Sequence, residues 1–499
     1  MEAMDLMDPR RRLGHNIRLM IGYVLVGIAL LLLTIILLFV AYGFGLQNGK
    51  VIQSGLLFLS STPNPAHVYL NGVQYQNDTN TKLLLQEATY RVTLTRAGYR
   101  DWERPISVVG GQVEFYRYPF LFPLDLTAIA AQTYQSAPTL VSESNDQNWL
   151  LVSQAGKLDS FDVYNLANPG QKPTVITLPA GTLTTAAGVQ SLAAVAWAND
   201  DNHLLLKHTY GPNTEYLLLN RSSPASSQNI TKILQLPPTG ITLSLNNGQS
   251  DHYLVYDATS QVLSQNSLGS PSLVPLVDHI LAFAADNDSS DTIAYVTPDS
   301  TNPLQVSVMI YNGGKKYLIR HEAAGQHYLL AATDYSGDTY VAISAEEANT
   351  AYVYKDPVEQ ITDPRFGVAV PAQAFTVTHP TYAGFSISGQ YAVFENGARF
   401  AVYDVDNDQG FSYNVTDSLD SPMTHAEWMD GARLYYISHS QVVVFDYDGR
   451  NRQVLTPADS RYPLFFDSNY KFMYAFTTDP ANKLQEILTT TSLRTKADQ

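Results

Sequence analysis

Cysteine is absent from the 499-residue sequence. Its absence excludes disulfide bonds, cysteine-ligated zinc or iron–sulfur clusters, and thiol nucleophiles. Charged residues are also scarce, at 15% of the chain compared with about 25% in a typical soluble domain. The formal net charge is -16, and the lysines and arginines form no basic stripe beyond the N-terminus. Because such a stripe is needed to neutralise phosphates, we expect no nucleic-acid partner.

Several catalytic motifs are missing too. The sequence contains no Gly-x-Ser-x-Gly nucleophile elbow and no His-Glu-x-x-His metal motif. The pair Gly43 and Gly45 lacks the Gly-Lys that completes a phosphate-binding loop. We therefore assign no catalytic, cofactor-binding or metal-binding residue, and we expect a protein that is not an enzyme and has no cofactor.

The 11 histidines are dispersed along the chain. His203 and His208 are five residues apart, and His321 and His327 are six apart. On a single strand, the first pair would point to opposite faces and the second to the same face. Exposed or hydrogen-bonded histidines are favoured over a metal-binding pair. The acidic turn 286–291 offers oxygen ligands for calcium but lacks the glycine and final glutamate of an EF-hand loop, so ordinary turn chemistry explains it equally well.

A long uncharged stretch lies near the N-terminus, with no charged side chain between Arg18 and Lys50. Residues 19–44 are mostly apolar, and about 20 residues suffice to cross the hydrocarbon core of a membrane. We therefore predict a transmembrane helix over 19–44. The alternative, a cleaved signal peptide, fits less well because its apolar part is usually about 7–15 residues long and precedes a small-residue cleavage site.

Arginines just before this stretch predict its orientation. Arg10, Arg11, Arg12 and Arg18 form a basic cluster, and the positive-inside rule places such a cluster in the cytoplasm. We therefore expect a cytoplasmic tail at 1–18 and a single-pass protein of the cell membrane with its bulk outside the cytoplasm.

The composition of the chain after the predicted helix favours β-structure, because tyrosine, threonine, glycine and proline are abundant. Residues 55–124 have the pattern of short strands joined by turns, with Asn71-Gly72 as a strong hairpin dipeptide. About 70 residues are enough for a small β-sandwich. The expected strands are 55–61, 66–70, 89–95, 102–109 and 113–116.

This segment resembles a PEGA domain. Pro65 replaces the motif's glycine, and 77–81 replaces its Gly-x-Thr-Pro. The resemblance implies a surface-protein module of envelope or S-layer contexts without catalytic residues, and we expect Tyr99 and Trp102 to be core aromatics. The matching positions are Pro63-Asn64-Pro65-Ala66, Asn71-Gly72, Tyr90, Gly98-Tyr99 and Trp102.

From residue 127 onwards the chain repeats a unit made of an apolar strand, a polar turn and an aromatic-rich strand. The second strands begin at an average spacing of 46 residues between Leu150 and Phe472. A period of about 40–45 residues with four strands per unit predicts a β-propeller blade. One such sheet cannot bury both of its faces alone, so stacking around an axis is required. Eight blades over 127–493 fit best, and seven is the alternative.

Further strands complete these units. Third strands are expected at 161–164, 351–354, 400–404 and 442–446, and outer strands at 316–320 and 453–456. The last unit lacks an outer strand, which we expect residues 127–135 to supply and so close the ring. The run from Phe385 to Phe394 resembles the TolB-like propeller pattern, whereas the WD, kelch and sialidase repeat signatures are absent.

The predicted fold class is therefore all-β: a β-propeller preceded by a small PEGA-like β-sandwich and one N-terminal transmembrane helix. The leading hypothesis is a non-catalytic, membrane-anchored envelope protein whose propeller and PEGA-like domain bind envelope proteins or cell-surface glycans. One alternative is a glycan-processing enzyme that uses the central funnel of the propeller. The other is an extracellular sensor, which would need a separate signalling partner because the cytoplasmic tail is so short.

Overall fold

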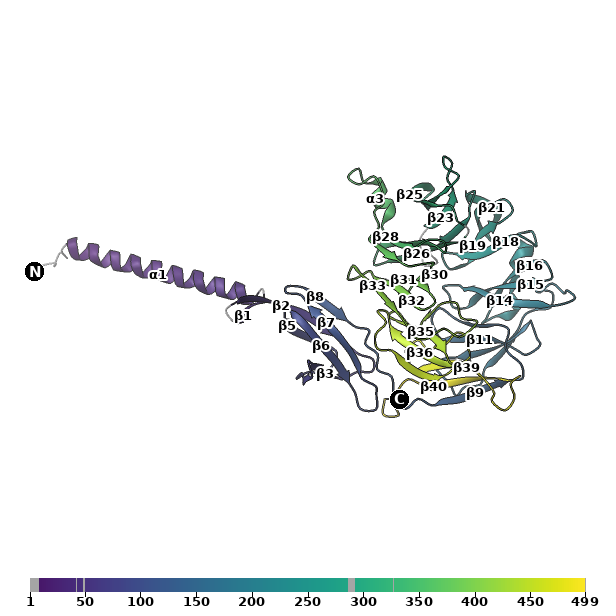
Figure 1. Cartoon of the computed structure of the whole chain (residues 1–499), viewed down its shortest axis with the longest axis horizontal. Coiled ribbons are helices and arrows are strands. Elements are labelled where there is room, and N and C mark those ends of the chain that lie inside the picture. The colour runs from purple at the N-terminus through teal and green to yellow at the C-terminus, as the bar shows by residue number, and fades with distance from the viewer. Residues whose placement is uncertain (1–8, 42, 48–49, 286–291, 326, 499) are drawn as a thin grey trace, which may run out of the picture. The chain divides into compact units, whose positions relative to one another are not determined.

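The computed structural model of the chain describes residues 9–41, 43–47, 50–285, 292–325 and 327–498. The chain divides into two units, Met1–Leu124 and Asp125–Ala497, whose elements are labelled in Figure 1.

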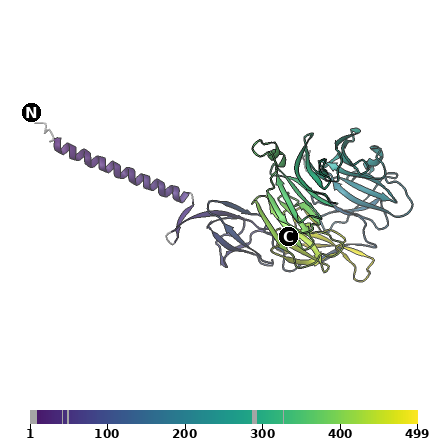
Figure 2. The same cartoon turned by 45° about the horizontal axis from the view of Figure 1, so that its top comes forward.

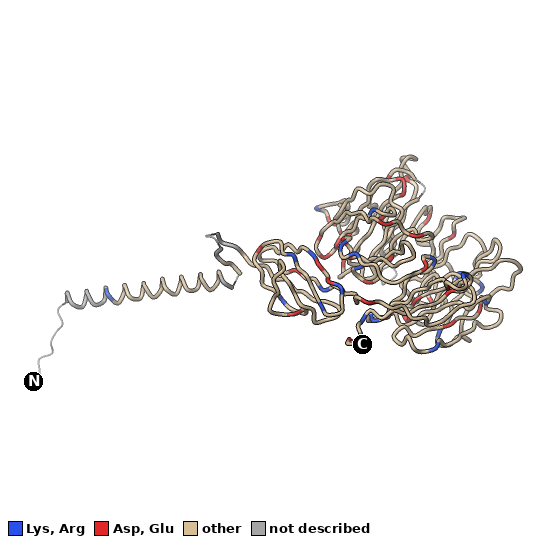
Figure 3. Tube along the Cα trace, turned by 60° about the horizontal axis from the view of Figure 1, so that its bottom comes forward, with Lys and Arg blue, Asp and Glu red and all other residues tan. Residues whose placement is uncertain are grey.

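The first unit begins with a long helix, α1 (Pro9–Ala41). Its segment Ile17–Phe39 has a mean hydropathy of 2.9 and packs against no core. Its one charged residue is Arg18, next to its start, and Figure 3 shows the rest of the segment free of charged residues. Such an exposed apolar surface is unfavourable in water and suits lipid, so α1 is a candidate membrane span or signal sequence. The helix ends at Ala41 rather than at residue 44, because Gly43 takes a φ of 71° and Phe44 begins a strand.

The rest of the first unit is a β-sandwich of two four-stranded sheets, as the sequence predicts. In one sheet β2 (Lys50–Leu59) lies between antiparallel β1 (Phe44–Gln47) and β5 (Thr81–Gln86) and also pairs in parallel with β8 (Val113–Tyr116). The other sheet has the order β4 (Val73–Gln74), β3 (His67–Leu70), β6 (Ala88–Thr95) and β7 (Trp102–Val108).

Alternating apolar side chains fill the space between the two sheets. Trp102 and Tyr99 are only 1% and 3% exposed, which confirms that they are core aromatics. Asn71 and Gly72 both have positive φ angles and form the predicted hairpin between β3 and β4. The strand β5 was not predicted, because its three consecutive leucines obscure the period of two.

The second unit is a β-propeller. Within the described residues its strands form eight four-stranded antiparallel sheets, which follow one another around the unit (Figures 1 and 2). The first strands of neighbouring sheets lie against one another, as β22, β26 and β30 do, so the first strand of each sheet is the inner one. We number the sheets as blades 1 to 8 in chain order.

The strands are given from the inner strand outwards. Blade 1 has β10 (Val141–Glu143), β11 (Trp149–Ser153), β12 (Ser160–Asn165) and β13 (Thr174–Thr177), and blade 2 has β14 (Gln190–Trp197), β15 (His203–Tyr210), β16 (Asn213–Asn220) and β17 (Gln228–Asn229). Blade 3 has β18 (Ile241–Asn246), β19 (Gln249–Asp257), β20 (Val262–Ser267) and β21 (Ser270–Val277), and blade 4 has β22 (Ala282–Ala285), β23 (Ile293–Pro298), β24 (Gln305–Asn312) and β25 (Lys315–Ala323).

Blade 5 has β26 (Tyr328–Tyr335), β27 (Asp338–Ala345), β28 (Thr350–Lys355) and β29 (Gln373–Thr376), and blade 6 has β30 (Tyr382–Phe385), β31 (Tyr391–Asn396), β32 (Arg399–Asp404) and β33 (Gln409–Asn414). Blade 7 has β34 (Glu427–Trp428), β35 (Arg433–Ser438), β36 (Gln441–Asp446) and β37 (Gln453–Pro457), and blade 8 has β38 (Phe465–Phe466), β39 (Phe472–Thr478), β40 (Glu486–Ser492) and β9 (Ala128–Tyr134). Short helical turns η1 (Pro224–Ser226), α2 (Ile230–Ile233) and α3 (Pro357–Thr362) lie in the connections.

Blade 8 is built from both ends of the propeller sequence. Its outer strand β9 pairs with β40, and Thr133 lies opposite Ile487. This pairing confirms that residues 127–135 supply the missing strand. The junction of blades 8 and 1 is also packed, because Tyr134, Leu150 and Tyr474 share one apolar core.

The polar turns that mark the repeat lie between the first and second strands of each described blade. Neighbouring turns are joined by hydrogen bonds: the Asn199 amide donates to the Gly248 carbonyl (2.8 Å), and the Asn145 side chain donates to the Trp197 carbonyl (3.2 Å). We call this side of the propeller the turn face. The opposite side, which carries the turns between second and third strands and the connections between blades, is the connection face.

The closure predicts a specific cross-link. Cysteines at Thr133 and Ile487 should form an intramolecular disulfide on oxidation, because opposed strand residues have Cβ atoms about 4.5–5.5 Å apart. The closed form should be more stable by about 2–4 kcal/mol. Non-reducing electrophoresis and thermal unfolding measure the two effects. The pair T133C/V274C, which joins β9 to the outer strand of blade 3, should stay reduced; equal cross-linking of both pairs would contradict the closure.

Candidate functional site

Two aromatic rings from neighbouring blades stack on the connection face. Tyr382 is the first residue of β30 in blade 6, and His425 lies just before β34 in blade 7. Their ring centroids are 3.9 Å apart and the ring planes differ by 7°. Gly384 makes this arrangement possible, since a Cβ there would lie 2.4 Å from the Tyr382 hydroxyl. We call this stacked pair, which lies where two inner strands begin, the platform.

A carboxylate lies beside this platform. The Nε2 atom of His425 is 3.5 Å from Oε1 of Glu427, and the side chains are 27% and 45% exposed. Burial, together with the nearby carboxylates of Glu427 and Glu395, raises the pKa of Tyr382, so its hydroxyl stays protonated and can donate a hydrogen bond. The three side chains thus offer an aromatic surface, a hydrogen-bond donor and an acceptor to a partner.

Behind the platform lies a buried acid. Glu395, on β31, has an exposed fraction of 0%, and its two carboxyl oxygens accept from the Ala426 amide at 2.9 and 3.1 Å. Burial raises the pKa of Glu395 well above its usual range. Glu395 therefore joins blade 6 to blade 7 and is sealed from solvent, where burial favours its protonated form.

A surface hollow of about 280 Å³ lies on the same face, between the outer strands of blades 5 and 6. Arg399, Ser412 and Asn414 contribute polar groups to it, and Phe400 stacks on Tyr413 with ring centroids 5.2 Å apart. The connection at 377–381, which leads from β29 to β30, runs from this hollow to Tyr382. The hollow and the platform therefore belong to one side of blade 6.

A second perturbed carboxyl lies at the junction that closes the ring. Glu143, on β10, accepts a hydrogen bond from the Phe466 amide of blade 8 (2.8 Å). Burial raises the pKa of Glu143 to about 8; the Phe466 amide opposes this shift, and the neighbouring carboxylates of Asp146 and Asp467 add to it. Like Glu395, it links two blades through a backbone amide.

The sequence singled out two histidine pairs, and the structure separates the members of each. His203 and His208 both lie on β15, five residues apart and so on opposite faces of the strand. His321 lies on β25 and His327 precedes β26, so they are not on one strand. His321 pairs with Asp299 (2.8 Å).

His208 is fully buried, within a polar network of blade 2. Its Nδ1 lies 2.8 Å from Oε1 of Glu215, and its Nε2 lies 2.9 Å from Oε1 of Gln190. Glu215 also accepts from Thr184 and Asn229. Burial acts against ionisation of Glu215, but these hydrogen bonds prevail and lower its pKa. Each group is satisfied within the protein, so the network is structural.

The acidic turns behave as turn chemistry predicts. Asp430 accepts the amides of Ala432 and Arg433, both at 2.8 Å, and Asp467 accepts the Asn469 amide at 3.2 Å. The proposed calcium turn 286–291 lies outside the described residues. Elsewhere in the described chain, no group of three or more His, Asp or Glu side chains is arranged to hold a metal ion.

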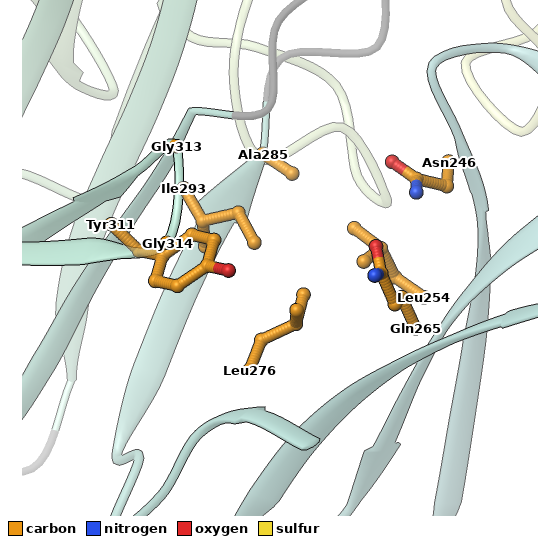
Figure 4. A pocket seen from close by; sticks show the side chains of 9 residues that line it. All are labelled: Asn246, Leu254, Gln265, Leu276, Ala285, Ile293, Tyr311, Gly313 and Gly314. Atoms are coloured by element: carbon orange, nitrogen blue, oxygen red, sulfur yellow. The ribbon is translucent and has the colours of Figure 1, made fainter. Parts of the chain in front are cut away.

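Figure 4 shows a small pocket between blades 3 and 4. It encloses about 140 Å³, less than the about 300–1,000 Å³ of a typical ligand site. Leu254, Leu276 and Ile293 line it on one side, and the amides of Asn246 and Gln265 contribute polar groups on another. The pocket is therefore too small for a sugar chain or a peptide.

None of the platform residues was singled out from the sequence. Tyr382 and His425 are 43 residues apart, close to one repeat, and this spacing alone places them at similar positions of neighbouring blades. The pairing of a tyrosine with a histidine across two blades has no local motif, so the period could not have shown that the rings stack.

Parts of the chain are similar to known proteins. Residues 54–117 match the model of the PEGA domain. The Dos1 propeller is similar in structure, with 12% identity, a TM-score of 0.45 and coverage of 74% of this chain and 96% of that one. Dipeptidyl peptidase 4 of Porphyromonas gingivalis has the same identity and TM-score, with 74% and 60% covered. Apo AztD of Citrobacter koseri has 11% identity, a TM-score of 0.39, and 80% and 96% covered.

No curated protein matches the chain. The fold and the comparisons define its class: a protein with an apolar N-terminal helix, a PEGA domain and a β-propeller. Within that class, this chain has an eight-bladed ring and a PEGA domain at 54–117.

Glu143 predicts a pH-dependent stability. Its pKa is higher in the folded chain than the ordinary 4.5, so the folded state holds the proton more tightly. Stability should therefore fall as the pH rises from 4.5 to about 8, by up to about 1.4 kcal/mol per pH unit. The variant E143Q keeps an acceptor for the Phe466 amide but cannot ionise, so it should not lose this stability as the pH rises.

Thermal unfolding across this pH range tests the effect. E143Q should melt above the wild type at pH 8 and together with it at pH 4.5, whereas E346Q, an exposed control, should follow the wild type throughout. A constant difference between E143Q and the wild type would contradict the raised pKa.

Glu395 predicts a contrast between two variants. E395A leaves the Ala426 amide buried without an acceptor and should lower the free energy of unfolding by about 1–3 kcal/mol. E395Q resembles the protonated acid and should stay close to the wild type at neutral pH. Urea unfolding measures the free energy of unfolding of both variants. Equal destabilisation by the two variants would show that Glu395 is held ionised.

Proposed function

We propose that this protein is a non-catalytic binding protein, anchored in the cell membrane by α1, with its PEGA domain and propeller outside the cytoplasm. The propeller binds an envelope protein or a cell-surface glycan on the connection face of blades 6 and 7. The observation that supports this most is the partly exposed platform of Tyr382 and His425 beside Glu427.

The chemistry of this platform suits binding. An aromatic face contributes apolar contact with a fixed orientation, and the neighbouring hydroxyl and carboxylate select polar groups of the partner. Such sites, with a few polar groups around an apolar surface, are typical of recognition. The hollow at Arg399 extends the same side and gives a longer partner a second contact.

The burial of Glu395 argues against the alternative of a glycan-processing enzyme. Glycoside hydrolysis generally uses two carboxyl groups on either side of the scissile bond, one of them protonated. Glu395 has the raised pKa of such an acid, but it is sealed, and both of its oxygens accept from the Ala426 amide.

The charge pattern supports the proposed orientation. The arginines at 10–12 and at 18 precede the apolar stretch, and the positive-inside rule keeps them in the cytoplasm. In the described part of the chain, lysines and arginines are scattered among acidic residues (Figure 3), which does not favour a nucleic-acid partner. Alkaline carbonate extraction tests the anchor: an anchored chain stays with the membrane, and a released chain would contradict the proposal.

Binding is tested with purified full-length chain in detergent. Glycan arrays and pull-downs from envelope extracts identify the partner, and Y382A and H425A should weaken its binding about tenfold, equivalent to about 1.4 kcal/mol. H252A is the matched control, because His252 is also a partly exposed histidine beside an acidic side chain, Asp251. Equal weakening by H252A, or no partner for the wild type, would contradict the proposal.

A further inference from the structure

The two sheets of the PEGA domain differ in their outer faces. On the β3–β6–β7 sheet this face is polar, with Arg91 paired to Glu103 (2.7 Å) and Thr89 bonded to Ser107 (2.9 Å). That is the usual arrangement of an antiparallel sheet with one side in water. The β2–β5–β8 sheet departs from it.

Strand β2 shows the departure most clearly. Leu57 and Leu59 point into the sandwich and are fully buried, so Leu56 and Phe58 point outward. An amphipathic strand would place polar residues at these two positions. The chain instead carries apolar side chains on both sides of β2.

The neighbouring strands extend this apolar face (Figure 1). Leu84 and Val113 flank Leu56 and are 65% and 51% exposed. Phe115 lies beside Phe58, with ring centroids 4.9 Å apart and ring planes differing by 14°. We call these five residues the apolar face of the PEGA domain.

Two cationic side chains lie at its edge. Lys82 lies opposite Phe58, and the Arg117 guanidinium lies 4.5 Å from the centroid of the Phe115 ring. The remaining outward positions of β2 and β5 whose side chains are described carry Ser54 and Gln86. This cationic rim occurs in a chain of net charge -16.

The apolar face lies close to the end of α1 along the chain. The Ser54 amide donates to the carbonyl of Gly43 (2.8 Å), two residues beyond the end of the helix. At about 3.3 Å per residue, Leu56 and Phe58 lie no more than about 7 and 13 Å further along β2. The headgroup layer of a bilayer is about 5–7 Å deep on each side, so these residues reach it when β2 lies along the bilayer surface.

We propose that the apolar face of the PEGA domain docks on the surface of the membrane that α1 spans. Leu56, Leu84 and Val113 enter the boundary between headgroups and acyl chains, Phe58 and Phe115 take the interfacial position that aromatic rings favour, and Lys82 and Arg117 contact lipid phosphates. Apolar and aromatic residues rimmed by Lys and Arg are typical of interfacial segments. Docking would hold the PEGA domain against the bilayer.

This inference rests on the proposed anchoring of α1, and site-specific labelling tests it. The chain has no cysteine, so a single V113C carries one bimane fluorophore. The matched control is V73C, because Val73 is also an exposed valine (71%) but lies on the other sheet. Both full-length chains are reconstituted into phosphatidylcholine vesicles that contain lipid with a nitroxide near the headgroup.

Docking predicts that the nitroxide quenches bimane at V113C by at least half and leaves V73C nearly unquenched. Adding L84E and F115E to V113C should abolish the quenching while the chain stays with the vesicles. Equal quenching at V113C and V73C would overturn the proposal. Cross-linking of V113C chains to one another without quenching would also overturn it and identify a second copy as the occupant.

Vesicle flotation after an alkaline wash separates this inference from the proposed function. If the wild-type chain leaves the vesicles, the anchor itself is wrong. If the chain floats with the vesicles and V113C is unquenched, the anchor holds and only the docking is wrong.

Discussion

Each sheet of the propeller has two apolar faces, and only another sheet of the same kind can cover them. The apolar cores accordingly lie between blades: Leu151 and Phe161 of blade 1 share a core with Leu204 and Leu217 of blade 2. A linear stack would leave its two end sheets uncovered, whereas a ring leaves none. The pairing of β9 with β40 completes blade 8 and brings it against blade 1. The other seven junctions between blades therefore depend on this closing contact.

The same constraint explains the unusual acids near the axis. Where inner strands converge, backbone amides are left without sheet partners and must find acceptors. Glu143 and Glu395 supply these acceptors to the Phe466 and Ala426 amides of neighbouring blades. Because burial penalises the charged form, both carboxyls are easier to bury protonated than ionised. Their raised pKa values thus reflect junctions between blades, whereas raised values in a cleft often mark catalysis.

The PEGA domain obeys a different constraint. A small sandwich needs one buried side on each sheet, and Leu57, Leu83 and Trp102 provide it. Nothing in that core requires Leu56, Phe58 or Phe115 to be apolar. Their outer face is therefore explained by something beyond the stability of the sandwich, and its closeness in the chain to α1 directs attention to the bilayer. The platform on the propeller is a separate surface, so the proposed lipid contact and the proposed partner contact use different parts of the chain.

The sequence by itself determined the order of the parts. The uncharged run before Lys50 indicated the long helix, Asn71-Gly72 and Trp102 indicated the PEGA domain, and the period of 46 residues indicated the eight blades and even the strand that closes them. These features are local, because alternation within a strand and the chemistry of a turn depend on residues that are adjacent in the chain.

Only the tertiary structure decided which side chains meet. Tyr382 stacks on His425, and Glu395 is sealed beneath Ala426, although all four residues look ordinary in the sequence. The strand β5, hidden by its run of leucines, and the outward direction of Leu84 also appeared only in the fold. Burial and stacking depend on the neighbouring sheet. Which sheet lies beside a strand is decided by packing between residues that are far apart in the sequence, and a local sequence pattern does not contain that information.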